Sequence, residues 1–497
     1  DMDKLRELQS DVMMELTRCK ISVDRLTLRQ LDGFLSVVPF GYNHFGSQYE
    51  RVLPASSVAN LYPFNYSGKT DPHGFYLGRD KFGTNILTDF DRRSDDKTNA
   101  NVLILGNSGQ GKSHLLKGIL ANLRESGKSL IVLDPEAEYQ ELCENLGGCY
   151  LDYLSGEYVI NPLQPLAWNE ETDNEDDERT PEQRDAAPIS RFPISESGKL
   201  APAPETSVVP VPGPFQKTTM LSRHISYLKD FFRSYKDFTT AQLDTIELML
   251  QKLYRRFDMD DYTDFSQVAP DKFPTMSDFY DLLEEEFDLY DPKRKNLFSE
   301  ETIQEVCLGL HSMCKGAESK YFNGHTNIKD DKFLVFGVKG IMELNRSLRD
   351  ALLFSILSYM TNALLGAGNY VGALDELYLF LTNLTAIEYI RNLMKRDRKK
   401  DSLLVLASQN IEDFLQPGVR ELTKPLFSIP THQFLFNPGQ LEPKAFCDTL
   451  QLEQAEFELI RYPERGTCLY RCGNERYLLQ VHFPEFKEAM FGSAGGR

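Results

Sequence analysis

The chain has 497 residues, of which 41% are hydrophobic, and a formal net charge of −19. This length allows a large core and two or three domains, which excludes a small module held together by disulfides. The acidic balance argues against a surface that is basic throughout and coats DNA, although a local basic patch at residues 395–400 remains open. None of the eight cysteines stands in a C-x-x-C pair, so we expect reduced thiols and no zinc site.

Membrane-spanning and secretory segments are not indicated by the sequence. No apolar run reaches the length that a bilayer requires, and no signal peptide is evident. The nearest candidate, residues 351–365, is interrupted by Ser, Thr and Asn, so we expect a core helix there. Residue 1 is Asp rather than Met, which predicts a fragment or a processed form of a longer protein.

The N-terminal part of the chain offers little that points to chemistry. We interpret residues 1–60 as the truncated end of an N-terminal domain with a connecting helix, because apolar residues recur at heptad-like spacing from Leu5 to Leu16. Short strands and turns are expected between Tyr62 and Gly78.

The most informative motif is the segment from Gly106 to Ser113. Its sequence, GNSGQGKS, fits the phosphate-binding pattern G-x-x-x-x-G-K-[ST] completely. Residues 101–105 form an apolar run typical of a buried parallel strand, and residues 114–123 continue at helical period. The glycines therefore fall on a strand-to-helix turn, which is the context that the motif requires.

This turn predicts an ATP and Mg²⁺ site. Gly109 and Gly111 allow successive backbone N–H groups to surround a phosphate at a helix N-terminus, where the helix dipole also favours anions. We expect Lys112 to reach the β- and γ-phosphates and Ser113 to bind Mg²⁺. The predicted nucleotide-binding residues are Gly106, Asn107, Ser108, Gly109, Gln110, Gly111, Lys112, Ser113 and His114.

A second cluster of acids follows the apolar run at residues 130–133. Residues 134–139 read DPEAEY. Acids that follow a second strand of a sheet could reach the site or cap the next helix, and the sequence favours neither alternative.

The middle of the chain divides into two segments of different composition. Residues 168–218 are acidic and Pro-rich, so we expect a disordered loop. Residues 219–325 show helical periodicity broken by prolines and are predicted to be an all-α insertion.

Alternation of strands and helices then resumes, with strands predicted at residues 332–337, 370–374 and 402–407 and helices at residues 346–365 and 386–395. Such alternation is typical of a parallel sheet covered by helices. The predicted fold is therefore α/β, with a parallel central sheet interrupted by the all-α insertion.

Two acids, Asp375 and Glu376, directly follow the strand predicted at residues 370–374. A carboxylate at the C-terminal end of a parallel strand beside a phosphate loop can hold Mg²⁺, so we assign Asp375 to the metal, through water. Glu376 is expected to orient and deprotonate the attacking water. A solvated strand end would look the same in sequence.

Three further residues are catalytic candidates. Gln409 ends the last predicted strand and could sense the γ-phosphate, with a turn or capping role as the alternative. Arg398, and Arg396 as the second choice, could enter a neighbouring subunit's site and stabilise transition-state charge. A basic cluster that offsets a helix dipole is the simpler interpretation of the two arginines.

These motifs together resemble the CagE/TrbE/VirB family, the TraC-like ATPases of the HerA–FtsK group of RecA-like motors. The resemblance rests on the phosphate loop and on DPEAEY (134–139), INPL (160–163), FNGHTNI (322–328), ALDELYLFL (373–381) and RKKDSLLVLASQN (398–410). Residues 429–437 and 465–473 are similar to the closing strands of the family, and the resemblance covers about residue 60 to the end.

The resemblance implies a RecA-like P-loop domain formed by residues 61–167 and 326–497. It further implies an ATPase that energises type IV secretion or conjugative transfer from the cytoplasm, peripheral at the inner face of the cell membrane. The expected assembly is a homo-oligomer, a hexamer when working and a monomer or dimer in isolation. The expected partners are other secretion components, including the coupling protein, and contact with nucleic acid stays open.

Two alternatives remain at this point. A DNA-translocating coupling protein or FtsK/HerA-type ATPase would normally carry transmembrane helices near its start or a DNA-reading module near its end, and neither is visible. A nucleotide-binding scaffold with little turnover is disfavoured by the presence of Lys112, Asp375, Glu376 and Gln409 together.

Overall fold

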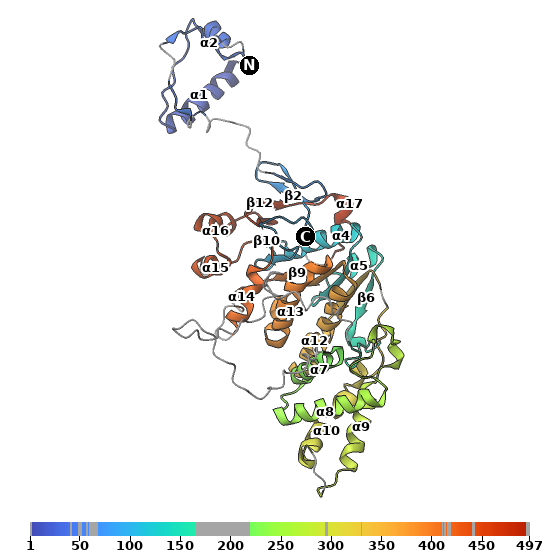
Figure 1. Ribbon diagram of the computed structural model, residues 1–497. Coiled ribbons are helices and arrows are strands. Elements are labelled where there is room, and N and C mark those ends of the chain that lie inside the picture. The colour runs from blue at the N-terminus through green and yellow to red at the C-terminus, as the bar shows by residue number, and fades with distance from the viewer. Residues whose placement is uncertain are drawn as a thin grey trace, which may run out of the picture. The chain divides into compact units, whose positions relative to one another are not determined.

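We describe the protein from a computed structural model (Figure 1). The residues described are 2–39, 42–47, 52–55, 58, 68–165, 219–293, 297–329, 331–382, 384–409, 411, 414, 419–439 and 443–493. The expected disordered loop at residues 168–218 lies outside them. The chain forms two compact units, and the boundary between them falls between Tyr66 and Ser67. This boundary falls slightly later than the expected one at residue 60.

The first unit contains two helices, α1 (Met2–Arg18) and α2 (Gln30–Val37). Helix α1 covers the stretch of heptad-like spacing, and none of its described residues is buried. Leu5, Leu8 and Val12 are about half exposed along it.

The second unit is built on one mixed sheet that has 12 strands among the described residues, in the order β1-β3-β2-β12-β11-β10-β4-β9-β8-β5-β7-β6. The strands are β1 (Lys69–Thr70), β2 (Phe75–Asp80), β3 (Asn85–Thr88), β4 (Val102–Leu105), β5 (Ser129–Asp134), β6 (Cys149–Asp152), β7 (Phe333–Gly337), β8 (Tyr370–Leu374), β9 (Leu403–Ser408), β10 (His432–Leu435), β11 (Thr467–Cys472) and β12 (Glu475–Val481). From β10 to β6 all neighbours are parallel, whereas β10–β11, β11–β12, β12–β2 and β2–β3 are antiparallel.

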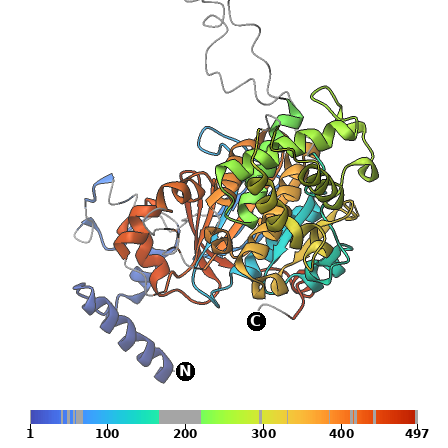
Figure 2. The ribbon, with the colours of Figure 1, turned by 90° about the horizontal axis from the view of Figure 1, so that it is seen from below.

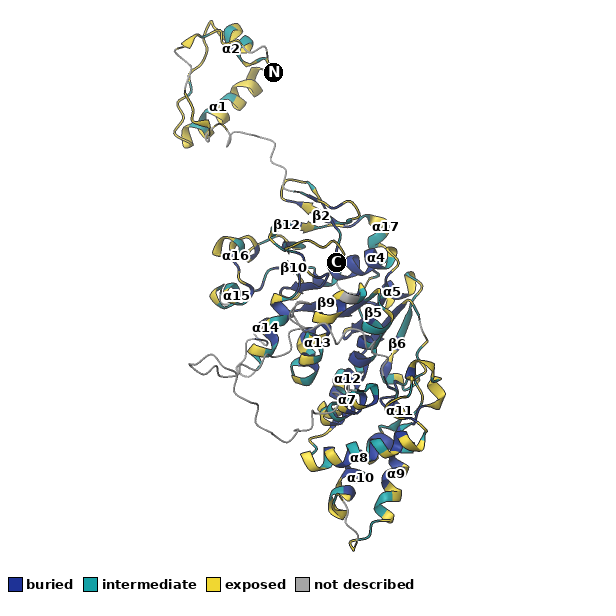
Figure 3. Cartoon of the chain, in the orientation of Figure 1, coloured by how far each residue is buried: buried dark blue, intermediate teal, exposed yellow. Residues whose placement is uncertain are grey.

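The parallel strands are buried on both faces because helices cover both (Figure 3). Val102 and Ile104 of β4 point into a cluster with α4 (Lys112–Glu125) and α5 (Gln140–Asn145), while Leu103 and Leu105 point into a cluster on the other face. Alternate residues of a strand face opposite sides, so an uninterrupted apolar strand such as this one suits the middle of a three-layer α/β/α arrangement.

The second cluster includes the helices of residues 219–325 together with α12 (Arg346–Asn362), α13 (Leu384–Arg396) and α14 (Arg420–Ser428). Seen from below, the green and yellow helices of residues 219–325 gather on the side of this unit away from the red C-terminal helices (Figure 2). The segment consists of α7 (Met220–Tyr235), α8 (Thr240–Arg256), α9 (Met276–Asp288), α10 (Glu300–Cys314) and α11 (Ser319–Phe322), with short 3-10 turns between them. The described residues of this segment form helices, and their core is continuous with that of the sheet.

The remaining helices follow the later strands of the chain. They are α15 (Pro443–Leu450), α16 (Gln454–Arg461) and α17 (Glu485–Glu488). Helix α17 belongs to a C-terminal segment, residues 483–493, that packs along α4. Phe483 lies so close to Gly118 that a Cβ at Gly118 would come within 2.0 Å of the ring, and Lys117 Nζ donates a 3.0 Å hydrogen bond to the Phe491 carbonyl.

Among the described residues one helical stretch, Arg346–Ala367, is long and apolar enough to cross a membrane by length and composition. It comprises α12 and a π-helical turn at Ala363–Ala367. Inside the protein 67% of its most apolar window is buried, where it packs against α7 and the sheet. This burial agrees with the expected core helix.

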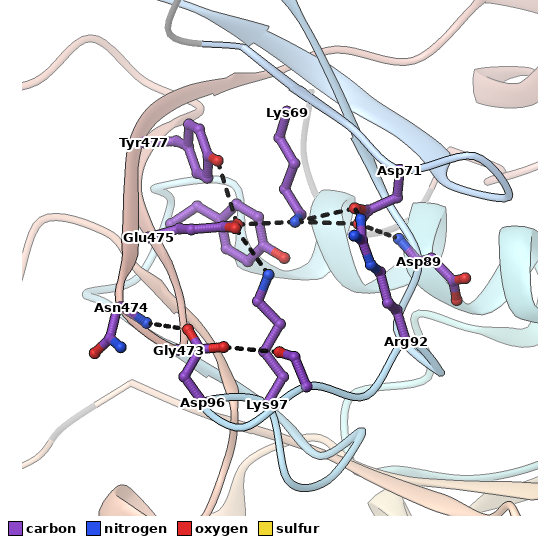
Figure 4. A network of polar contacts seen from close by, with 12 residues as sticks. Lys69, Asp71, Asp89, Arg92, Asp96, Lys97, Gly473, Asn474, Glu475 and Tyr477 are labelled. Atoms are coloured by element: carbon purple, nitrogen blue, oxygen red, sulfur yellow. Dashed lines mark hydrogen bonds and ion pairs between the residues drawn. The ribbon is translucent and has the colours of Figure 1, made fainter.

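A charged network joins the first strands of this unit to its last hairpin (Figure 4). Lys69 and Lys97 each donate to Glu475, at 2.9 and 2.8 Å, and Lys69 also pairs with Asp71 at 3.1 Å. Burial alone would raise the pKa of Glu475, but the two lysines hold it below its ordinary value. The side chains of Lys69 and Asp71 are 4% and 3% exposed, and each has a second partner: Lys69 also pairs with Glu475, and Asp71 also pairs with Arg92. The buried charges therefore stabilise one another as a network.

Candidate nucleotide-binding site

The phosphate loop lies between β4 and α4, where the sequence placed it. Gly109 and Gly111 have φ angles of 75° and 105°, in the left-handed region that favours glycine, and Gly111 is the N-cap of α4. The backbone N–H groups at the start of this helix, which have no partner within the helix, therefore point toward the turn.

Lys112 is the first residue of α4 and is only 7% exposed. Its Nζ donates a 3.1 Å hydrogen bond to the Asn107 carbonyl, so the ammonium lies back across the loop. Burial lowers the pKa of Lys112, and the nearby carboxylates of Glu376, Asp375 and Glu138 oppose this shift. A buried ammonium facing carboxylates is well placed to exchange them for phosphate oxygens.

Asp375 and Glu376 follow β8 and are 8% and 5% exposed. The Tyr139 hydroxyl donates to Asp375 Oδ2 at 2.7 Å, and the Glu376 N–H donates to Asp375 Oδ1 at 3.0 Å. Glu376 has a φ of 58°, which costs a non-glycine residue on the order of 1 kcal/mol and turns its side chain out of the strand direction. Burial raises the pKa of Asp375 to about 6 and that of Glu376 to about 7.

Gln409 meets Glu376 because β9 lies between β8 and β4. Leu374 pairs with Leu406, and Leu105 pairs with Ser408, so all three strands end at the same edge of the sheet. Gln409 Nε2 donates to Glu376 Oε1, whereas Glu376 Oε2 is buried and has no hydrogen-bond partner among the described residues. One oxygen of the carboxylate is thus fixed and the other can accept a proton.

These groups share a cavity of about 310 Å³. It is lined by Ser108, Gly109, Gly111, Lys112, Ser113, Glu136, Glu138, Asp375, Glu376, Gln409 and Arg465. Four of these residues are acids and two are cations, so a polyanion entering alone would meet excess negative charge. A divalent cation that accompanies it would remove this repulsion.

The acids at the end of β5 and in the turn after it divide between the two roles that the sequence left open. Asp134 is fully buried and accepts hydrogen bonds from the backbone N–H groups of Glu138 and Tyr139, at 3.0 and 2.9 Å. It therefore caps the turn, and that turn places Glu136 and Glu138 in the cavity wall and the Tyr139 hydroxyl on Asp375.

The two candidate trans-acting arginines lie elsewhere. Arg396 ends α13, and Arg398 lies in the 3-10 turn Asp397–Lys400 that precedes β9. Since β4 and β9 are parallel and the phosphate loop follows β4, both arginines lie at the opposite edge of the sheet from the cavity. Both side chains are exposed there, so neither reaches the phosphate loop of its own chain.

His114 and Arg465 complete the surroundings of the loop. His114 Nε2 pairs with Glu488 at 3.4 Å, and its ring contacts Phe491 edge-on. Arg465 precedes β11 and was not among the predicted site residues. In the sequence, residues 465–473 resemble only a closing strand of the family, and the order of the strands is what brings Arg465 beside the phosphate loop.

The oxygen donors present fit Mg²⁺. Ser113 and Asp375 both line the cavity, and Mg²⁺ prefers one or two carboxylates together with hydroxyl, water and phosphate oxygens. No group of three or more His, Cys, Asp or Glu suited to a metal occurs in the described part of the chain.

Comparisons with known proteins agree with this geometry. The profile of the TraG P-loop domain matches residues 79–181. The solved structure of VirB4 of Thermoanaerobacter pseudethanolicus is 27% identical, with a TM-score of 0.69 over 85% of this chain and 100% of that one. The protein is VirB4/TraC-like. Its RecA-like α/β fold with a mostly parallel sheet, and the family resemblance, were therefore predicted correctly.

Two sequence relatives complete the picture. Protein TraC of Escherichia coli (strain K12) is 30% identical over 152 residues, which cover 29% of this chain and 17% of TraC. An uncharacterized protein of Bacillus anthracis is 20% identical over 483 residues, which cover 88% of this chain and 68% of that protein. The match to TraC thus spans less than a fifth of that relative.

Proposed function

We propose that this VirB4/TraC-like chain is an ATP-hydrolysing motor of a type IV secretion or conjugative transfer system, which energises assembly of the apparatus or passage of substrate. The observation that carries the proposal is one cavity in which Lys112 and the phosphate loop face Asp375, Glu376 and Gln409. The structural likeness to VirB4 supports the biological setting.

Binding follows from the loop. The backbone N–H groups from Gly109 to Ser113 would surround the phosphates, and Lys112 would exchange its contact with the Asn107 carbonyl for β- and γ-phosphate oxygens. The low exposure of Lys112 strengthens this attraction because little water competes for the ammonium.

Ser113 and Asp375 would hold Mg²⁺, Asp375 through water. When bound, the metal supplies positive charge that neutralises the phosphates and the acids of the cavity. Tyr139 fixes one oxygen of Asp375 and the Glu376 N–H fixes the other, so the carboxylate is oriented before nucleotide arrives.

Hydrolysis requires a group that accepts a proton from the attacking water. Among the described residues Glu376 Oε2 has no hydrogen-bond partner, and a carboxyl pKa of about 7 is close to the value at which a general base is most effective near neutral pH. Gln409 donates a hydrogen bond to the other oxygen of Glu376. It would also sense the γ-phosphate from the end of β9.

Arg398, with Arg396 as the second choice, would complete the site of a neighbouring subunit. Their place at the far edge of the sheet is consistent with action in trans, which requires a homo-oligomer. We propose a hexamer at the cytoplasmic face of the inner membrane, in contact with other secretion components including the coupling protein. A DNA-translocating coupling protein is the less favoured alternative, since the likeness is to VirB4.

The test is Mg²⁺-dependent ATP hydrolysis by the purified chain and by Lys112→Ala. The variant should lose turnover, because it loses the buried ammonium that binds the β- and γ-phosphates. Conjugative transfer by the cells that encode the protein should fall with it. Near-normal hydrolysis by a folded variant would refute the site, and normal transfer without hydrolysis would refute the motor role.

A further inference from the structure

The order of the strands gives the cavity two distinct sides. On one side of β4 lie β9 and β8, which carry Gln409, Asp375 and Glu376 at their ends. On the other side lie β10 and β11, and Arg465 lines the same cavity from the turn before β11. Four strand spacings separate β8 from β11, roughly 19 Å at about 4.8 Å each.

The positions of Glu376 and Gln409 indicate which end of the nucleotide lies on which side of β4. The γ-phosphate must face Glu376 and Gln409, which lie toward β8 and β9. A nucleotide that lies across the N-terminus of α4 therefore has its α-phosphate and nucleoside toward β10 and β11.

The turn that carries Arg465 is attached to the phosphate loop itself. The Gly466 N–H donates a 3.0 Å hydrogen bond to the Gln110 carbonyl, and the Val481 N–H donates to the Gly466 carbonyl at 2.9 Å. A Cβ at Gly111 would lie 3.4 Å from the Gly466 Cα, so the two backbones are in contact. These bonds hold the arginine backbone at a fixed place beside the loop.

Charge at this end of the cavity is consistent with the placement. Burial lowers the pKa of His114, and the positive charges of Lys117 and Arg465 act in the same direction. Arg465 thus lies close to the first turn of α4. It is the second cation of the cavity wall, and Lys112 is the first.

We propose that Arg465 binds the α-phosphate of the nucleotide within its own subunit. Its guanidinium would donate to α-phosphate oxygens, a geometry for which arginine is well suited. This inference rests on the proposed ATPase function and adds a residue that acts on affinity rather than on the chemical step. ATP and ADP share the α-phosphate, so the residue should not distinguish them.

The test compares Arg465→Ala with the intact chain by titration calorimetry, using ADP and the non-hydrolysable analogue ADPNP with Mg²⁺. Loss of a charge-assisted contact should weaken both ligands by the same factor, about tenfold. In steady-state hydrolysis KM for ATP should rise by about the same factor, while kcat changes by less than about twofold. Arg465→Lys should recover part of the affinity.

Arg461→Ala is the matched control, because Arg461 is an exposed arginine that ends α16 and pairs with Glu458 at 3.1 Å. It should bind both nucleotides normally. Weaker binding of ADPNP alone, or a large loss of kcat with unchanged affinity, would place Arg465 at the γ-phosphate and overturn the proposal. Unchanged binding would also overturn it.

Two further measurements distinguish misfolding of the variant, failure of the proposed function and failure of the α-phosphate assignment. If Arg465→Ala does not fold, judged by circular dichroism, Arg465→Gln takes its place with the same expected result. If Lys112→Ala binds ADP and ADPNP normally, the proposed function itself fails. If Lys112→Ala loses binding and the Arg465 variants do not, only the α-phosphate assignment fails.

Discussion

A buried carboxyl outside the cavity, that of Asp397, allows a quantitative test of the structure. The side chain is 1% exposed, accepts a long hydrogen bond of 3.5 Å from Asn101 Nδ2, and leaves Oδ2 without a partner among the described residues. Burial raises its pKa to about 8, although Asn101 and the charges of Arg93 and Arg398 oppose the shift. The folded protein therefore holds a proton at Asp397 that the unfolded chain has lost.

The sign of the effect follows from this difference. A carboxyl whose folded pKa exceeds its unfolded value of 3.8 stabilises the fold below that value, and the stabilisation is lost as the pH rises toward 8. Each pH unit within this window costs about 1.4 kcal/mol. Between pH 6 and pH 8 the loss is about 2 kcal/mol, since the folded group is half ionised at the upper limit.

Asp397→Asn removes this dependence because the amide keeps the shape and does not titrate. We expect the free energy of unfolding of the variant, relative to the intact chain, to rise by about 2 kcal/mol from pH 6 to pH 8. Urea unfolding followed by circular dichroism measures this difference. The pH range of the measurement stays above the pI of about 5.0, at which the chain would precipitate.

Asp95→Asn, at an exposed acid, is the control and should follow the intact chain at every pH. If Asp397→Asn and the intact chain also give parallel profiles from pH 6 to pH 8, Asp397 is not held protonated and the reasoning is wrong.

The other predictions concern the site. Glu376→Gln should bind ADPNP normally and lose turnover at least about 100-fold, because the amide cannot accept a proton; a joint loss of affinity and rate would indicate a structural role. Tyr139→Phe removes the 2.7 Å hydrogen bond to Asp375 and should raise the Mg²⁺ concentration for half-maximal nucleotide binding about fivefold, the equivalent of about 1 kcal/mol; an unchanged Mg²⁺ titration would contradict the orienting role. Chains with Arg398→Ala, mixed with Lys112→Ala chains, should regain activity that neither has alone; co-assembled mixtures that stay inactive would exclude action in trans.

Local sequence signals predicted the parallel half of the sheet well. The strand expected at residues 370–374 matches β8. The one expected at 332–337 begins one residue before β7, and the one expected at 402–407 is shifted by one residue from β9 at both ends. These strands are apolar on both faces and bounded by polar residues, so their identity depends on their own composition. The phosphate loop was equally predictable because its turn needs glycine at fixed positions.

The antiparallel half of the sheet and the rest of the site depend on contacts between residues far apart in the chain. Such contacts cannot be recognised from local patterns in a single sequence. Nothing local shows that β12 pairs with β2, or that the turn before β11 adjoins Gln110. For the same reason the sequence offered Arg396 and Arg398 and not Arg465. It also left the roles of the acids at residues 134–138 undecided, because capping and lining the cavity differ only in how the turn folds back.

The position of β4 at the centre of the sheet has a consequence for synthesis of the protein. Its partners β9 and β10 are encoded roughly 300 residues later, so a ribosome that adds about 5–20 residues per second needs some 15–60 s to supply them. During that time the apolar strand Val102–Leu105 has both edges unpaired, and the nucleotide cannot yet stabilise it. Nascent chains of this protein should therefore depend on chaperones until almost the whole sequence has emerged, and truncation within β10 should release an aggregating product rather than a weaker enzyme.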